Sequence, residues 1–368
     1  MPANKPPFDG EWVKLGELIS KAPIERCGDA KYPVYSMTMR DGIVEQAGRF
    51  KKAIASKDTS SYKVVKKNQL VVGFPIDEGV IYVQNHDAPG IMSPAYNVWN
   101  IDLGRVDPSY LEFALHSPRS MAYYADKMRG TTARRRTLTA DGLREMKILL
   151  PSADGQIRVV NTLDEVRSLI EGANGQIAML DTLVKSRFVE MFGDPISNSK
   201  GLETQPGSAL FKIVNGKTKP MDERYETGFP AYGGNGVSWY SQDSLVDFPT
   251  IVVGRVGRHC GNVHLVNDPC WVTDNAMYIK RFHSNELDLI YLDELMRVVG
   301  FNRYADRGDL WKITQQPFME FNYPMPPLAQ QQELAAFVRQ VDKSRFIVQQ
   351  KIEKLQTLYD SLAQEYFG

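Results

Sequence analysis

Residues that could hold a phosphate or a cofactor occur in the sequence, but none completes a known motif. The stretch NGKT, at residues 215–218, resembles the end of a phosphate-binding loop. The pattern GxxxxGK[ST], however, requires a glycine five places before Gly216, where Phe211 stands. Gly254 and Gly257, in VVGRVGRHCG, do not form the GxGxxG of a dinucleotide-binding turn. The sequence therefore predicts no cofactor site in this chain.

Four potential metal ligands cluster in the second half: His259, Cys260, His264 and Cys270. They lack paired CxxC spacing and fall on expected strands, so we expect buried or surface residues rather than a zinc site. The three cysteines of the chain show no disulfide framework, and we expect free thiols. No Ser/His/Asp grouping can be placed, and the 44 acidic residues show no local pattern of a catalytic pair. The sequence thus predicts no catalytic residue.

Clustered cations are the strongest chemical signal. The run KMRGTTARRR, at residues 127–136, contains no acid, and phosphate is its natural counter-charge. A charge run is often only a solvated surface, but a second, more dilute set in the other half favours DNA binding. The predicted phosphate contacts are Lys127, Arg129, Arg134, Arg135 and Arg136 in the first half, and Arg255, Arg303, Arg307 and Lys312 in the second. Arg258, in the same region of the second half, is predicted to contact a base instead, because a guanidinium can make a bidentate contact with a base edge.

Two polar, glycine-containing stretches could bring base-reading side chains close to DNA. They are YPVYSMTMRDGIVEQ, at residues 32–46, and FPAYGGNGVSWY, at residues 229–240. Such segments suit a flexible loop that approaches a ligand, although residues 233–236 equally suit a hairpin turn. The predicted DNA contacts in these stretches are Arg40, Gly233, Gly234 and Asn235.

Two segments of the chain, one central and one at its C-terminal end, have similar sequences. LDTLVKSRFVEMFGD, from residue 180, aligns with LQTLYDSLAQEYFG, from residue 355, at an offset of 355 − 180 = 175. NQLVVGFPIDEGVIYV similarly resembles PTIVVGRVGRHCGNVHLV, and there Gly73 corresponds to Gly254 at an offset of 181. A repeat this long leaves room for a folded domain in each copy. We therefore predict two related domains.

A heptad seam precedes each ending and predicts two long helices that pair with each other. The alternative is two unrelated amphipathic helices, each covering its own domain. Gly172 and Gly175 are expected to bend or break the first helix. The predicted seam residues are Val159, Leu163, Val166, Ile170, Ile177 and Leu180 in the first helix, and Leu334, Val338, Val341, Ile352, Leu355 and Leu362 in the second.

Short Val- and Ile-rich runs separated by Gly, Pro and Asp indicate strands, and DPSYLEFAL and ELDLIYLDEL indicate matching short helices. The predicted class is α+β. Its expected parts are a first domain at 1–150, a central helix at 151–193, a second domain at 194–325 and a terminal helix at 326–368.

The composition is globular, with 43% hydrophobic residues among 368, and Lys plus Arg equal Asp plus Glu at 44. No apolar run is long enough to cross a bilayer, and the opening MPANKPPFDG lacks the apolar core of a signal peptide. These features predict a cytoplasmic protein.

Taken in order, these features resemble the DNA-specificity subunits of type I restriction-modification enzymes. The resemblance rests on the repeat, on YPVYSMTMRDGIVEQ followed by KDTSSYKVVKKNQLVVG, on FPAYGGNG and on PMPPLAQQQELAAFV, and it covers nearly the whole chain. It implies two target-recognition domains in a pseudo-twofold repeat, joined by two long antiparallel coiled-coil helices. Such a subunit reads a bipartite, asymmetric site on double-stranded DNA.

The resemblance also implies partners that carry the chemistry. Two methyltransferase subunits using S-adenosylmethionine would dock on this chain, and restriction subunits using ATP and magnesium would join them. The other interpretations are a coiled-coil scaffold that binds proteins, or a complete DNA methyltransferase or nuclease. The last is disfavoured because the sequence holds no NPPY or DPPY stretch and no acidic nuclease motif.

Overall fold

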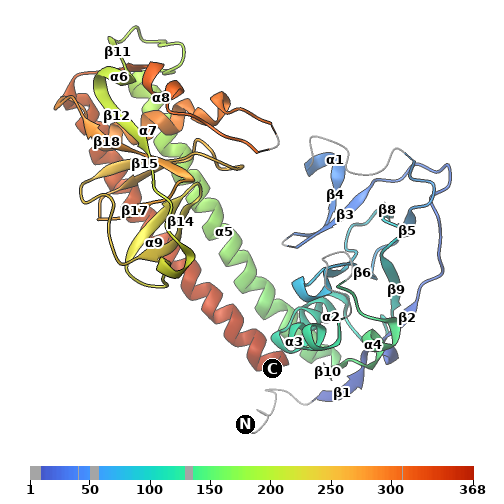
Figure 1. The fold of residues 1–368 in the computed structure, drawn as a ribbon. Helices are drawn as coiled ribbons and strands as arrows, with labels where there is room; N and C mark the ends of the chain where they lie inside the picture. The colour runs from blue at the N-terminus through green and yellow to red at the C-terminus, as the bar shows by residue number, and fades with distance from the viewer. Residues whose placement is uncertain (1–9, 40, 50–57, 129–135, 309) are drawn as a thin grey trace. The chain divides into compact units, whose positions relative to one another are not determined.

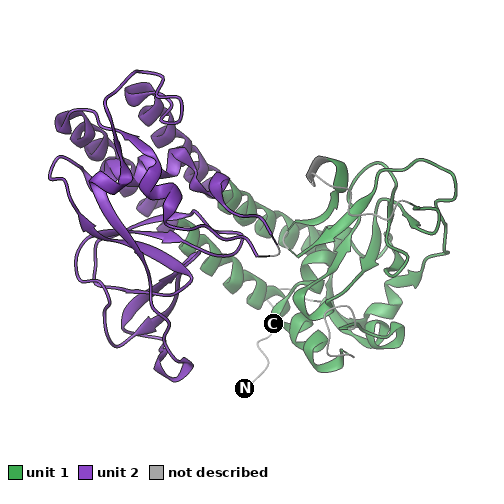
Figure 2. Ribbon diagram, turned by 45° about the horizontal axis from the view of Figure 1, so that its top comes forward, with its two compact units in different colours: residues 1–172, 351–368 green, residues 173–350 purple. Residues whose placement is uncertain are grey.

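The computed structural model describes residues 10–368 except 40, 50–57, 129–135 and 309. It divides into two compact units (Figure 2). Unit 1 comprises residues 1–172 and 351–368, and unit 2 comprises residues 173–350. The compact units therefore differ from the segments expected along the chain, because each one contains a globular part together with half of both long helices.

The two long helices are α5, Ala153–Phe192, and α9, Leu328–Phe367, each of 40 residues (Figure 1). Helix α5 ends at Gly193, which has a φ of +76° and donates its N–H to the Val189 carbonyl at 2.8 Å. A glycine in the left-handed region closes a helix without the steric cost that a side chain would add. Both predicted helices are confirmed, and each is slightly longer than its seam.

The expected break at Gly172 and Gly175 is wrong, because α5 runs through both residues. A side chain at either glycine would meet no heavy atom within 4 Å, so neither is required for close packing. Each glycine costs about 1 kcal/mol of helix propensity. That cost is small beside the packing of a 40-residue helix along its apolar side.

Within each unit the two helices lie side by side and antiparallel. In unit 1, Val159 and Leu163 near the start of α5 share a hydrophobic core with Phe367 at the end of α9. In unit 2 the other ends of the helices meet: Val184 near the end of α5 shares a hydrophobic core with Val338 near the start of α9. Ion pairs between the helices follow the same register: Arg187 with Glu333 and Arg345 with Asp181, both at 2.8 Å.

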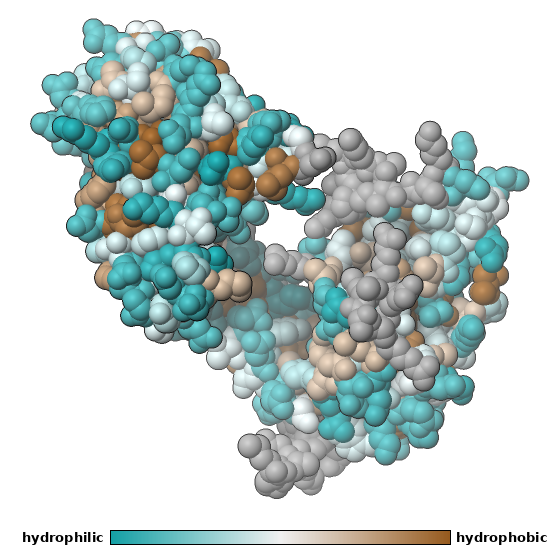
Figure 3. All heavy atoms as spheres, in the orientation of Figure 1, coloured by the Kyte–Doolittle hydropathy of each residue, from teal (hydrophilic) through white to brown (hydrophobic). Residues whose placement is uncertain are grey.

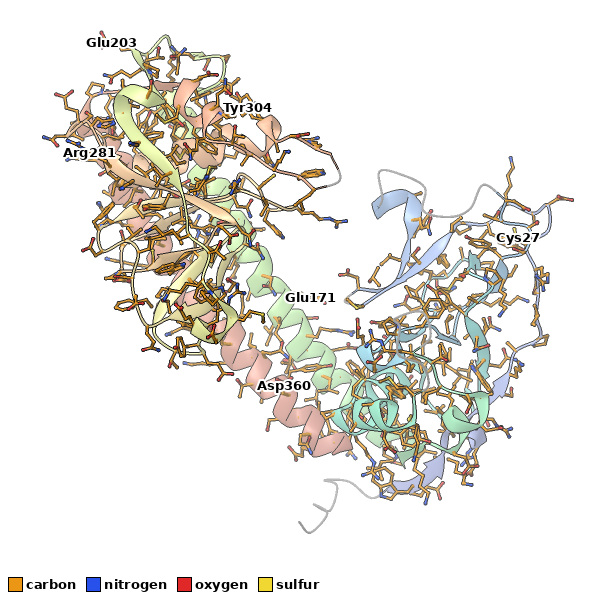
Figure 4. The ribbon with its side chains drawn as sticks, in the orientation of Figure 1. Cys27, Glu171, Glu203, Arg281, Tyr304 and Asp360 are labelled. Carbon is orange, nitrogen blue, oxygen red and sulfur yellow. The ribbon has the colours of Figure 1, made fainter. Side chains whose placement is uncertain are left out.

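The seam is fully buried only where a globular part covers it. The buried seam residues are Val159, Leu163, Val166, Leu334, Val338 and Val341. The half-buried ones are Ile170, Ile177, Leu180, Ile352, Leu355 and Leu362. A two-helix pair alone cannot enclose its seam, so the globular parts supply the third side. Charged side chains project away from the seam, as Glu171 on α5 and Asp360 on α9 show in unit 1 (Figure 4).

The globular part of unit 1 is built on a four-stranded antiparallel sheet in the order β2-β9-β6-β7. Its strands are Ile19–Lys21, Asn97–Ile101, Gln69–Val72 and Ile81–Val83. Three two-stranded ladders accompany it: β1 (Gly10–Lys14) with β10 (Lys147–Pro151), β3 (Tyr35–Thr38) with β4 (Gly42–Glu45), and β5 (Lys63–Val65) with β8 (Gly90–Met92). The helices are α1 (Gln46–Arg49), α2 (Pro108–Leu115), α3 (Pro118–Lys127) and α4 (Ala140–Glu145).

Unit 2 repeats this plan. Its four-stranded sheet has the order β12-β18-β15-β16, with strands Phe211–Asn215, Ala276–Phe282, Thr250–Gly254 and Val263–Val266. The ladder β11 (Thr204–Pro206) with β19 (Asn322–Pro324) matches β1 with β10, and the three-stranded β14-β13-β17 (Gly236–Ser241, Phe229–Gly233, Trp271–Val272) contains the counterpart of the β3–β4 hairpin. The helices are α6 (Gly207–Leu210), α7 (Leu289–Val299) and α8 (Gln316–Glu320). The predicted repeat of the fold is thus confirmed for the four-stranded sheet, the ladder of first and last strands and the hairpin, whereas, among the described residues, the β5–β8 ladder and the β13–β17 pair each occur in one unit.

One hydrogen-bonded joint recurs where each long helix starts. In unit 1 the buried Gln156 of α5 accepts from Asp107 N at 2.7 Å and donates to the carbonyls of Arg105 and Pro151 at 3.1 Å. In unit 2, Gln331 of α9 accepts from Asp288 N at 2.9 Å and donates to the carbonyls of Glu286 and Pro326.

The same aspartates cap α2 and α7, and one tyrosine in each short helix extends the joint. Tyr110 donates its hydroxyl to the Leu149 carbonyl, and Tyr291 donates to that of Pro324, both at 2.7 Å. Because these polar groups are buried, each depends on its partner. This joint fixes the short helix, the last strand and the long helix to one another.

Candidate nucleic-acid interface

Two segments of unit 2 carry four of the five cations predicted in the second half and lie against each other. We call residues 255–261, after β15, and residues 305–313, after the 3-10 helix η5 (Phe301–Tyr304), the loop pair; residue 309 lies outside the described part. Ile313 N donates to the Arg255 carbonyl at 2.9 Å, and Gly257 N donates to the Trp311 carbonyl at 2.8 Å. These backbone bonds bring together cations that are about 50 residues apart in the sequence.

The four cations of the loop pair differ in what holds them. Arg258 is exposed and has no hydrogen bond or ion pair to the described residues, whereas Arg307 lies 4.9 Å from the centre of the Trp311 ring. Arg255 donates to the Asp274 carbonyl at 3.1 Å. Lys312 lies 3.7 Å from Asp306, an exposed pair that is worth little in water. Among the residues that the structure describes, neither Arg258 nor Arg307 therefore pairs with a carboxylate.

The glycine-rich stretch forms a hairpin, so the hairpin interpretation of residues 233–236 is confirmed. Gly233 at the end of β13 pairs with Gly236 at the start of β14, and Gly236 has a φ of +95°. Asn235 at the tip is exposed. The hairpin packs on the end of β15, because a side-chain carbon at Gly254 would lie only 2.5 Å from the Gly234 carbonyl oxygen. That contact sets the hairpin beside the loop pair.

A pocket of about 550 Å³ opens next to the hairpin. It is lined by Lys219, Arg224, residues 233–239 and residues 273–275. The Arg224 guanidinium lies 5.3 Å from the Trp239 ring, and Lys219 is buried between Asp243, Glu223 and the Trp271 ring. The buried Thr273 hydroxyl has no hydrogen-bond partner among the described residues. Lys219, Arg224 and Thr273 were missed by sequence reasoning, although Lys219 follows the rejected NGKT stretch directly.

Arg303 lies on η5, beside the exposed Tyr304 (Figure 4). The pKa of Asp194 is lowered by the hydrogen bond from Ile196 N and, more weakly, by the Arg303 charge. Arg303 therefore has a carboxylate near it, unlike Arg258.

In unit 1 the described cations of the basic run are already paired. Arg136 forms ion pairs with Asp77 and Glu78, and its carbonyl accepts from Ile76 N at 3.0 Å. Lys127 pairs with the adjacent Asp126 at 2.8 Å, and both side chains are exposed. Arg40, Arg129, Arg134 and Arg135 lie outside the described residues. The Arg136 pairs give that residue a structural role, and its predicted contact with phosphate stays a prediction.

The four potential metal ligands are distributed over separate environments. Cys260 and Cys270 belong to different hydrophobic clusters, and both are buried thiols. His264, on β16, lines a different cavity in unit 2. Among the residues that the structure describes, no three His, Cys, Asp or Glu side chains are placed to share a metal ion.

Comparison with known proteins agrees with the family resemblance and with the fold. Residues 207–357 match the family model of the type I restriction modification DNA specificity domain, a stretch that contains the hairpin and the loop pair. The type I restriction enzyme EcoprrI specificity subunit of Escherichia coli is 24% identical over 114 residues, which are 31% of this chain. The aligned part spans 28% of that relative's length. The resemblance drawn from the sequence is confirmed.

Two solved structures share the fold over their whole length. The crystal structure of a type I restriction-modification S subunit from M. genitalium has a TM-score of 0.57 at 15% identity, covering 100% of this chain and 98% of the other. A chain from a study of complex assembly and conformational transition of the type I R-M system has a TM-score of 0.54 at 17% identity, covering 99% of both. The predicted α+β class is therefore confirmed.

Proposed function

We propose that this chain, in which residues 207–357 belong to the type I restriction modification DNA specificity domain family, is the DNA-reading subunit of a type I restriction-modification system. Each unit would read one half of a bipartite, asymmetric site on double-stranded DNA, and α5 and α9 would set the spacing of the halves. The observation that carries this proposal is the loop pair beside the hairpin: Arg258 and Arg307 pair with no carboxylate of the described residues, and Asn235 at the hairpin tip is exposed.

The chemistry of these side chains assigns them different tasks. Arg258 and Arg307 suit phosphate oxygens, which position a protein on DNA without reading its sequence. Asn235 suits an adenine, since an amide can donate and accept at the same base edge. Arg255 and Gly254 support the site by holding the loop pair and the hairpin, and Arg303 and Lys312 would add contacts at its margin.

Partner subunits would dock along the long helices, where α5 and α9 keep apolar side chains in solvent. Met179, Phe346 and Ile347 are 73%, 64% and 67% exposed. Figure 3 shows apolar groups, in brown, scattered over a mostly hydrophilic surface of unit 2. Methyltransferase and restriction subunits would occupy such contacts and would bring S-adenosylmethionine, ATP and magnesium with them.

No reaction is assigned to this chain. None of the helices in its described part is long and apolar enough to cross a membrane. Its proposed place is the cytoplasm, with the DNA and with the partner subunits.

Methylation mapping tests the proposal. The chain is expressed with its methyltransferase subunit in cells that lack other methyltransferases, and modified adenines are located across the genome. We expect one asymmetric two-part motif with a fixed unread spacer. A continuous motif would contradict the two-domain reading, and methyl transfer by the purified chain alone would favour a complete methyltransferase.

A further inference from the structure

A second cavity of unit 2, of about 660 Å³, lies where α7 and β16 face the long helices. Its charged lining comes from four elements: Asp293, Glu294 and Arg297 on α7, His264 on β16, Asp181 and Lys185 on α5, and Asp342 and Arg345 on α9. It does not belong to the hairpin pocket, because the two cavities share no lining residue.

Most of these charges are satisfied within the cavity. Arg297 donates to both oxygens of Asp293, at 2.7 and 3.3 Å. Arg345 pairs with Asp181 at 2.8 Å and with Asp342 at 2.5 Å. Both arginines of the lining are therefore paired with aspartates, and one acidic residue of the lining remains without an arginine partner.

Glu294 is the acid without a partner. Glu294 as a residue is 7% exposed, and its side chain makes no hydrogen bond or ion pair to the described residues. Burial, followed by the charge of Asp293, raises the pKa of Glu294 to about 7, and Asp342 adds to the effect. The opposing charges that act on it are those of Arg297 and Arg345, both already engaged. Because burial disfavours its charge, the ionised form of this carboxyl would be stabilised by a cation bound beside it.

Two further polar atoms in the lining lack partners. His264 Nε2 and Arg345 Nε are buried and have no hydrogen-bond partner among the described residues. The pKa of His264 is lowered, chiefly by burial, so the imidazole adds no positive charge near neutral pH. Four carboxylates therefore face three cations in this lining.

The equivalent place in unit 1 shows how such a site can be filled. Residue 294 corresponds to Phe113 at the offset of 181, and residue 342 corresponds to Arg167 at the offset of 175. In unit 1 the Arg167 guanidinium lies 5.1 Å from the centre of the Phe113 ring. Unit 1 thus supplies its own guanidinium, whereas unit 2 has two carboxylates at these positions.

An exposed apolar side chain follows the cavity lining by one turn of α9. Phe346 follows Asp342 by four residues on α9, so the two side chains lie on one face of the helix. Phe346 is 64% exposed. An apolar contact beside a buried carboxylate fits a long side chain with an apolar stem and a cationic head.

We propose that this cavity receives an arginine side chain of the protein subunit that docks along α5 and α9. Its guanidinium bridges Glu294 and Asp342, and its stem lies against Phe346. An arginine fits better than a lysine because a planar fork of donors can serve two carboxylates at once. The inference rests on the proposed docking of a methyltransferase subunit, and it specifies one contact of that interface.

The principal test measures the affinity of the full chain for its methyltransferase subunit. Glu294→Gln keeps the shape of the side chain and removes its charge. We expect the affinity to fall tenfold or more, because the incoming guanidinium would lose its buried counter-charge. Glu226→Gln, a change at an exposed carboxylate of the same unit, is the matched control and should leave the affinity unchanged. Equal affinities of wild type and Glu294→Gln would overturn the proposal.

A second variant imports the arrangement of unit 1. Glu294→Phe with Asp342→Arg places a ring and a guanidinium inside the cavity, and we expect it to exclude the subunit while the chain still binds DNA at both half-sites. Retained DNA binding separates loss of this contact from misfolding.

A small probe removes the dependence on the partner. Methylguanidinium chloride is titrated into the full chain labelled with ¹³C at glutamate carboxyls, against sodium chloride at equal ionic strength. A saturable shift of the resonance that disappears in Glu294→Gln supports the site, and methylammonium should give a weaker one. If the wild-type chain does not bind the methyltransferase subunit, the proposed docking is wrong, and so is the proposal of an arginine from that subunit. The probe then shows only whether the cavity binds a cation.

Discussion

The two units share a frame and differ in what they place on it. Both hold a buried glutamine at the start of a long helix, Gln156 and Gln331, with the same three backbone partners in the repeat. On the neighbouring face of α2 and α7, however, Phe113 under Arg167 is replaced by Glu294 near Asp342. The hydrogen bonds from the glutamine side chain to the backbone are thus the same in both units. The side chains at positions 113 and 294, and at 167 and 342, differ between the units in both size and charge.

The largest effect is expected from breaking the shared frame. Gln331→Leu would remove the partner of Asp288 N and of the Glu286 and Pro326 carbonyls, the last in a buried bond, at a cost of about 3 kcal/mol to the free energy of unfolding. Gln156→Leu should cost unit 1 a similar amount. Urea denaturation measures both. Gln332→Leu changes the next residue, which is exposed, and should alter the free energy of unfolding by no more than about 0.5 kcal/mol. An equal loss in this control would show that the hydrogen bonds of Gln331 do not stabilise the chain.

The next largest effect is expected when the end of α5 is replaced by the end of α9 from a second copy of the chain. A fragment of residues 195–368 lacks the part of α5 that packs Phe188 and Phe192 against Tyr291, at ring distances of 5.8 and 5.1 Å. A second copy can supply the end of its α9 instead, where Phe367 matches Phe192. Position 188 then falls on Ala363, which leaves space.

We therefore predict that the fragment dimerises, that it prefers an inverted repeat of one half-site, and that Ala363→Phe tightens the dimer at least tenfold by filling that space. Sedimentation equilibrium gives the dissociation constant. Gln364→Phe, on the exposed side of α9, serves as the control. A stable monomer would show that the halves are not interchangeable.

The cations provide a third comparison. Replacing Arg258 and Arg307 with Ala should reduce the slope of log affinity against log salt by about two, since each phosphate contact contributes about 0.9. Arg136→Ala should leave the slope unchanged if its charge is used by Asp77 and Glu78. Fluorescence anisotropy at several salt concentrations distinguishes the two. An unchanged slope for the Arg258 and Arg307 double variant would make the loop pair an ordinary solvated surface.

A fourth comparison concerns pH. The pKa of Glu294 is raised from 4.5 to about 7, mainly by burial and then by Asp293. The folded chain therefore retains a proton that the unfolded chain releases between these values, so this carboxyl makes stability fall as pH rises from about 4.5 to about 7. Each pKa unit corresponds to about 1.4 kcal/mol.

Glu294→Gln should remove that part of the pH dependence and leave the chain equally or more stable at pH 8. The other charged groups facing the carboxyl, which the variant keeps, are Asp293, Arg297, His264, Asp181, Lys185, Asp342 and Arg345. Urea melts at pH 5 and pH 8 provide the measurement. A variant with the same pH dependence as wild type would assign the effect to one of those groups.

The sequence predicted the parts of the fold that depend on local periodicity. The seams of α5 and α9 repeat every 3.5 residues, and the strands around Gly73 and Gly254 repeat between the halves. The break expected at Gly172 was wrong because local propensity is outweighed by packing on both sides of that residue.

The candidate site could be predicted only in part, because free and paired cations look alike in a sequence. Arg136 meets carboxylates more than 50 positions away, and Arg258 meets none among the described residues. Glu294 was missed for a related reason. The sequence LDELMR, at residues 292–297, contains three charged residues, a composition typical of an exposed helix. The residues become buried because α5 and α9 pack over α7.

The ladders β1–β10 and β11–β19 have a consequence for how such a chain can change. Each ladder pairs the first strand of a globular part with its last, as Lys14 opposite Lys147 and Thr204 opposite Pro324 illustrate. The backbone therefore arrives and departs at neighbouring points, and the segment between them can be lengthened or replaced without displacing the long helices. The extra six residues between Asp107 and Gln156, compared with the span from Asp288 to Gln331, are one such change. Recombination of genes at these ladders would transplant a whole recognition surface in one step.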